Sequence, residues 1–190
     1  MDHDVRTLRL GSIQTRDASE SENGIGVIEG YAAVFNQPSV DMGFIEFMDP
    51  KSFDGVDMTD TVALYNHNWD NVLGRVSGGT LKLTTDEKGL RFALTMPDTT
   101  VGRDTYENAK NGNLQGCSFG FTIADDDWTR GEDGNLIHTI LKIDELFEIS
   151  IVTMPAYTET SVKVTRGRES KDAEARHRAK LQLEILEGGY

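Results

Sequence analysis

Cysteine is almost absent from this sequence of 190 residues, which contains only Cys117. One cysteine excludes a disulfide within the chain and is typical of proteins from a reducing compartment. No apolar run approaches the length of about 20 residues that a membrane-spanning helix needs. The N-terminus also lacks the basic and then apolar layout of a signal peptide. We therefore expect a cytoplasmic protein that does not associate with membranes.

Basic residues are also scarce, with 19 Lys and Arg against 32 Asp and Glu, for a formal net charge of -13. This balance disfavours a nucleic-acid partner, because such binding depends on neutralising phosphates with Lys and Arg. The acidic run 125–127 has two interpretations, a loose calcium site or a solvated hairpin tip, and its irregular spacing favours the tip. No His or Cys pair has metal-ligand spacing, and no Gly-rich phosphate loop occurs. We expect no metal and no cofactor.

Short stretches of alternating polarity, separated by turn residues, make up most of the chain. They predict strands at 5–15, 26–35, 44–48, 61–67, 72–76, 81–84, 90–96, 114–123, 136–141, 147–153 and 161–165. The strands 72–76 and 81–84 are expected to form a hairpin around Ser77–Gly79. A short helix is predicted from Asp49 to Phe53, and a longer one between caps at 98–100 and 111–112.

This pattern predicts a mainly β fold with flanking helices (α+β), a closed or nearly closed β-barrel. The barrel domain is expected to span residues 1–165. Residues 166–190 are expected to form a charged tail, helical or disordered, that follows the basic linker Arg166-Gly-Arg168.

The strand predicted over 114–123 has an unusual face. Ser118 lies between Gly116 and Gly120 on that face, so a hydroxyl is flanked by two residues without side chains. Glycine inside a strand marks a place where another backbone or a ligand comes close. One interpretation is a nucleophile that an extended peptide can reach. The other is a closely packed strand in a small barrel, where glycine relieves crowding.

A nucleophilic serine needs a base, and the base needs a partner that orients it. His67 ends an apolar strand and is the best base candidate by position, although a histidine that simply closes a strand is an equally good interpretation. Glu148 lies inside an apolar strand, where an unpaired carboxylate is costly, so it is the candidate orienting group. It could also point outward from a barrel strand. His138 competes for the same role, because an imidazole can also hold another imidazole in place.

Three segments in fixed order carry a family resemblance. They are Leu64-Tyr-Asn-His-Asn-Trp-Asp-Asn-Val-Leu-Gly74, Asn113-Leu-Gln-Gly-Cys-Ser-Phe-Gly-Phe121 and Phe147-Glu-Ile-Ser-Ile-Val-Thr-Met-Pro-Ala156. This set resembles the prohead (capsid maturation) proteases of tailed bacteriophages, a serine protease family similar in fold to the herpesvirus assemblins. The resemblance extends over about residues 26–164.

The resemblance implies a β-barrel endopeptidase that cleaves scaffold and capsid-protein segments, and itself, inside the immature capsid. Ser118 matches the nucleophile of the family, His67 its histidine and Glu148 its acidic position. The herpesvirus relatives use a second histidine instead, which keeps His138 as the alternative third member.

The implied partners are capsid and scaffolding proteins, and the assemblin relatives suggest a second copy of the chain. The implied location is the host cytoplasm, inside assembling proheads. The tail after Arg168 is expected to tether the enzyme to scaffold and to be shed by self-cleavage. The competing hypothesis is a catalytically silent barrel that serves as a scaffold or capsid-assembly module.

Overall fold

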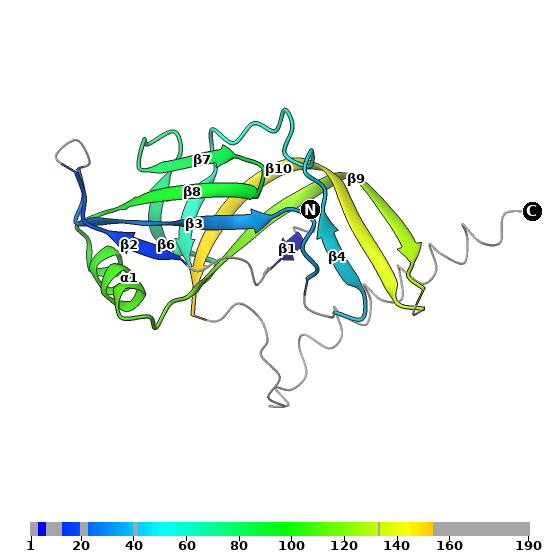
Figure 1. The fold of residues 1–190 in the computed structure, drawn as a ribbon. Coiled ribbons are helices and arrows are strands. Elements are labelled where there is room, and N and C mark those ends of the chain that lie inside the picture. Colours follow the sequence, from blue (N-terminus) through cyan, green and yellow to red (C-terminus); the bar gives the residue numbers. More distant parts are fainter. Residues whose placement is uncertain (1–3, 7–12, 20–22, 40–41, 133, 154–190) are drawn as a thin grey trace, which may run out of the picture.

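The structure is a computed structural model, and it describes residues 4–6, 13–19, 23–39, 42–132 and 134–153. In this part of the chain, two β-sheets and one α-helix form the fold (Figure 1). The elements are β1 (Asp4–Arg6), β2 (Gln14–Arg16), β3 (Gly26–Val34), β4 (Ile45–Met48), β5 (Val62–Tyr65), β6 (Asn68–Arg75), β7 (Leu81–Thr85), β8 (Gly89–Met96), α1 (Thr100–Lys110), β9 (Gly116–Arg130) and β10 (Leu136–Val152).

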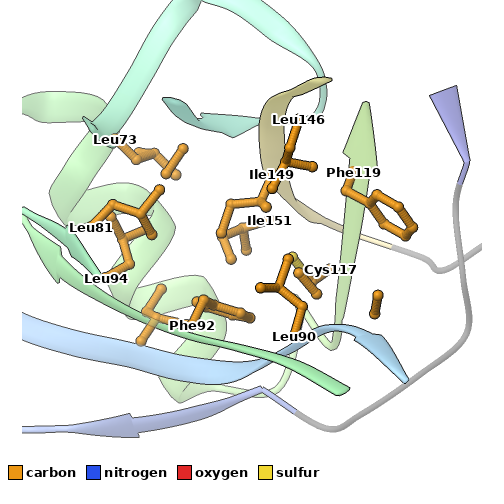
Figure 2. Close-up of a cluster of buried hydrophobic side chains, with 14 of the residues drawn as sticks. Leu73, Leu81, Leu90, Phe92, Leu94, Cys117, Phe119, Leu146, Ile149 and Ile151 are labelled. Atoms are coloured by element: carbon orange, nitrogen blue, oxygen red, sulfur yellow. The ribbon is translucent and has the colours of Figure 1, made fainter. Parts of the chain in front are cut away.

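The strands divide into a six-stranded and a four-stranded sheet. The larger sheet has the order β1-β9-β10-β5-β6, with β4 also paired to β10, and the smaller has the order β2-β3-β8-β7. The core consists of apolar side chains from both sheets (Figure 2). Phe92 and Leu94 come from β8, while Phe119 and Ile151 come from β9 and β10, and all four are fully buried. Alternation along each strand sends every second side chain into this core.

The prediction of a closed or nearly closed barrel is wrong, although the mainly β class is right. The two sheets are separate, and no strand ladder within the described residues joins the edge strand β6 to the edge strand β7. The expected hairpin of 72–76 with 81–84 is wrong for the same reason. β6 pairs with β5, β7 pairs with β8, and the turn residues at 77–79 carry the chain from one sheet to the other.

β9 and β10 form a long hairpin that extends beyond the other labelled strands and the helix (Figure 1). The acidic residues 125–127 belong to β9 and not to a loop, so the hairpin turns further along the chain, after Arg130 and before Leu136. The two predicted strands 136–141 and 147–153 are one strand with several register shifts. The first half of β10 pairs with β4 and the second half with β5, both in parallel. β10 is therefore the strand that positions its neighbours.

The predicted long helix is confirmed. Thr99 caps α1 by accepting a hydrogen bond from the backbone N–H of Gly102, and Gly112 follows its end with φ +75°. The short helix predicted from Asp49 to Phe53 is wrong, because that segment forms successive turns.

The last predicted strand, 161–165, and the tail 166–190 lie outside the described residues, so the domain boundary stays a prediction. No helix in the described ranges is long and apolar enough to cross a membrane.

Candidate active site

His67 lies in the tight turn between β5 and β6. Tyr65 and Asn68 pair across this hairpin, and the two loop residues, Asn66 and His67, have φ values of 50° and 57°. Positive φ at both positions is the pattern of a type I′ turn, which favours Asn followed by Gly. A left-handed backbone costs a residue with a Cβ about 1–2 kcal/mol. His67 occupies the glycine position, which points to a function for its side chain.

The His67 ring is held by Glu148 from β10. Nδ1 lies 2.8 Å from Glu148 Oε1, and Glu148 is only 3% exposed. An ionised carboxylate can only accept, so Nδ1–H is the donor, and in the neutral imidazole Nε2 then carries the lone pair. Nε2 is buried and has no hydrogen-bond partner among the described residues. Buried polar atoms without a partner are uncommon in proteins, and a catalytic role is one of the explanations for them.

Strand register places Ser118 on the same side of the sheet as Glu148. Ser118 on β9 pairs with Ser150 on β10, and Gly120 pairs with Glu148. Directly opposed residues in an antiparallel pair share a face, as do residues two apart on one strand. These four residues define what we call the site face of the six-stranded sheet. The opposite face of the same strands contributes Cys117 and Phe119 to the core (Figure 2).

The Ser118 side chain is fully buried in this structure. Because Nε2 of His67 has no partner among the described residues, no hydrogen bond joins it to the Ser118 hydroxyl here. Catalytic hydrogen bonds are often loose without substrate and tighten in the complex. A direct Ser118–His67 contact therefore stays a prediction. A substrate carbonyl can reach Ser118 only if the residues that cover it move.

Gly120 makes room for the catalytic carboxylate candidate. A Cβ built on Gly120 would lie 2.9 Å from Glu148 Oε1. The missing side chain of Gly120 thus accommodates Glu148, as the interpretation of glycine as relief of crowding predicts, and the approach of a substrate backbone to this strand stays a prediction. The sequence could not show that Glu148 occupies this space, because the pairing of residues 120 and 148 depends on strand register.

Ser150 is a site residue that the sequence reasoning missed. Its hydroxyl donates to Glu148 Oε2 at 2.6 Å and accepts from the backbone N–H of His67 at 3.0 Å. It follows Glu148 by two positions in a strand, and this spacing places both side chains on one face. The spacing of two residues between Glu148 and Ser150 in a predicted strand is the sequence signal that indicates their proximity.

His138 lies elsewhere on β10, ten residues before Glu148. Its Nδ1 is 2.9 Å from Glu46 Oε2, and its Nε2 is 2.7 Å from Asp126 Oδ2. The ring also stacks on Trp128, with centroids 4.1 Å apart. Both ring nitrogens thus face carboxylates that belong to the β4–β9–β10 junction. The structure brings Glu148, and not His138, to the His67 ring.

Cys117 is buried in the core between the two sheets. Burial, followed by the nearby charge of Glu148, raises the pKa of the thiol far above its ordinary value. The neutral thiol is therefore not a nucleophile. Among the described residues, no three His, Cys, Asp or Glu side chains are grouped so that they could hold a metal ion.

Comparison with known proteins identifies the family. Residues 12–174 match the family described as caudovirus prohead serine protease. The chain belongs to this family. The protease is 32% identical over 169 residues to the prohead protease of Enterobacteria phage HK97, covering 86% of this chain and 69% of that protein. No solved structure matches it.

Family membership decides between the two functional hypotheses. The protein is a serine peptidase that acts in capsid maturation within assembling phage proheads, with capsid and scaffold proteins as substrates. The competing hypothesis of a catalytically silent assembly module is therefore not supported.

Proposed function

We propose that Ser118 is the nucleophile, His67 the general base and Glu148 the group that orients the base, in an endopeptidase that cleaves scaffold and capsid proteins and itself. The observation that carries this proposal is the His67 Nδ1–Glu148 Oε1 hydrogen bond of 2.8 Å, which leaves a buried Nε2 lone pair on the face that carries Ser118. A serine on β9, a carboxylate on β10 and a histidine in the turn after β5 supply the groups of a serine protease triad, and these three strands are adjacent in one sheet.

The chemistry follows from these positions. His67 Nε2 takes the hydroxyl proton while Ser118 Oγ attacks the scissile carbonyl carbon, and Glu148 stabilises the imidazolium that forms. The imidazolium then gives its proton to the leaving amine, which departs as the acyl-enzyme forms. Water, activated by the same Nε2, hydrolyses this ester and restores Ser118. Glu148 stays ionised throughout, since its task is electrostatic and geometric.

Two finer features belong to the same proposal. The enzyme acts in the host cytoplasm, where proheads assemble, and it works as a homodimer, by the resemblance to assemblins. Light scattering after size-exclusion chromatography tests the homodimer, because the measured mass should be twice the 21.1 kDa of one chain. A single-chain mass at working concentration would contradict it.

Variants of the three residues test the catalytic assignment. Ser118→Ala should abolish both cleavage of capsid protein and labelling by a fluorophosphonate probe, with a rate loss on the order of 10⁴ to 10⁶. Glu148→Gln should lower kcat by about 10⁴, because the amide favours the wrong tautomer of His67. His138→Gln is the matched control and should leave kcat nearly unchanged. Cleavage by Ser118→Ala at the wild-type rate would refute the proposal.

A further inference from the structure

The Ser150 hydroxyl touches both partners of the His67–Glu148 pair. It is fully buried, donates to Glu148 Oε2 at 2.6 Å and accepts from the His67 backbone N–H at 3.0 Å. The hydroxyl thus donates its one proton to Glu148 and accepts with a lone pair from the His67 backbone, and these two residues must stay aligned. Its position opposite Ser118 places it in the centre of the site face.

Each contact fixes a degree of freedom that the pair itself leaves open. A carboxylate bound only through Oε1 can rotate about its terminal bond, and the Ser150 bond to Oε2 removes that rotation. The His67 backbone is held in a left-handed conformation that is unfavourable for its residue type, and the bond to its N–H secures the turn. The Ser150 hydroxyl therefore fixes the positions of both His67, which donates the Nδ1–Oε1 hydrogen bond, and Glu148, which accepts it.

We propose that Ser150 is a positioning residue of the protease, acting through His67 and Glu148 and not on the substrate. This inference rests on the proposed function, in which Glu148 orients His67. Because a misplacement of about 1 Å can cost about 100-fold in rate, Ser150→Ala should lower kcat by 10- to 100-fold. KM should change little, since Ser150 does not bind the substrate.

The kinetic test compares three variants of the full chain. Ser150→Ala removes the hydroxyl, Ser150→Thr keeps it and should recover most of kcat, and Ser52→Ala is the control, because Ser52 is another fully buried serine on the turn after β4. If Ser150→Ala fails to fold, Ser150→Cys retains the volume with a weaker donor and should show the same loss. A kcat within threefold of wild type for a folded Ser150→Ala or Ser150→Cys variant would refute the proposal.

A spectroscopic test needs no activity and therefore separates this inference from the proposed function. In the Ser118→Ala background, the His67 Nδ1–H proton should give a protected NMR signal, because it is hydrogen-bonded to the buried Glu148 carboxylate. Adding Ser150→Ala should broaden or abolish that signal by exchange with water, whereas adding Ser52→Ala should not. An unchanged signal would refute the role of Ser150. An inactive wild type with the expected signals would instead refute the proposed function alone.

Discussion

At the scale of single residues, the site depends on one unfavourable backbone conformation, at His67, and on the space left by one missing side chain, at Gly120. His67 adopts a left-handed backbone, at a cost of about 1–2 kcal/mol, so that its ring turns back over β10. Glu148 occupies the space left by the missing Cβ of Gly120. The His67 conformation costs stability, and both features hold the His67 imidazole against Glu148.

Replacing Gly120 tests this arrangement directly. Gly120→Ala puts a methyl group 2.9 Å from Glu148 Oε1 and should displace the carboxylate. We expect a loss of about 100-fold in kcat and a stability loss of about 1–3 kcal/mol from overpacking. Gly78→Ala is the control, because its Cβ would meet nothing closer than 3.5 Å. Full activity of Gly120→Ala, measured with chemical denaturation alongside, would show that Glu148 need not stay in place.

Cys117 gives a prediction about pH and reactivity. Its pKa is raised in the folded state, chiefly by burial, so the folded thiol stays neutral while the thiol of the unfolded chain ionises above about pH 8.5. The contribution of Cys117 to stability is thus complete below that pH and is lost as pH rises further. Thiol-specific reagents at pH 9 should label Cys117 only in denaturant. Rapid labelling of the native protein, with loss of activity, would contradict this placement.

At the scale of elements, β10 organises two separate polar sites on one strand. Its second half lies between β9 and β5 and carries Glu148 and Ser150. Its first half lies between β9 and β4 and carries His138, bonded to Glu46 and Asp126. The register shifts between Ile140 and Glu148 separate the two halves. The His138 group therefore links β4 to the long hairpin, and we predict that it does not contribute to catalysis.

His138→Gln should separate stability from activity. The change removes at least one buried hydrogen bond to a carboxylate, so we expect a loss of about 2–3 kcal/mol in the free energy of unfolding. The kcat of the folded enzyme should stay within about threefold of wild type, because the His138 ring is hydrogen-bonded to Glu46 and Asp126, whereas the His67 ring is hydrogen-bonded to Glu148. Thermal unfolding and steady-state kinetics on the same sample measure both. A large drop in kcat with unchanged stability would assign His138 to the active site.

At the scale of the whole molecule, two sheets enclose one core (Figure 1). The site residues of β9 and β10 lie on the face of the larger sheet that is opposite its core face. The core residues of β9 and β10 alternate with the site residues, so the same strands supply both. A substitution that disturbs the core packing of Phe119 or Ile149 will therefore also move Ser118 or Glu148. Stability and activity are linked through these two strands.

Self-cleavage of the charged C-terminal segment is a prediction from the sequence alone. Wild-type protein should lose residues after the Arg166-Gly-Arg168 linker on incubation, and Ser118→Ala should not. Intact-mass measurement over time follows the loss. Equal loss from both proteins would indicate a contaminating protease, and loss from neither would contradict self-processing. A chain truncated after Arg168 should unfold at nearly the wild-type temperature.

Much of the local structure could be predicted from the sequence. Alternation predicted most of the strands, and caps at Thr99 and Gly112 predicted α1, because these signals act between residues close in the chain. The same local signals placed Ser118 and Glu148 inside strands and His67 at the end of one. The motifs around them carried the resemblance to prohead proteases, which the family match confirms.

Only the tertiary structure decided how these strands pair. Two separate sheets and a closed barrel both have strands in which polar and apolar residues alternate. The two architectures differ in the backbone hydrogen bonds between strands that are far apart in sequence. Register alone sets Gly120 opposite Glu148 and Ser118 opposite Ser150. The left-handed turn between β5 and β6 carries the His67 ring, which is hydrogen-bonded to Glu148. Residue types therefore determined the available chemistry, while long-range pairing determined which groups meet.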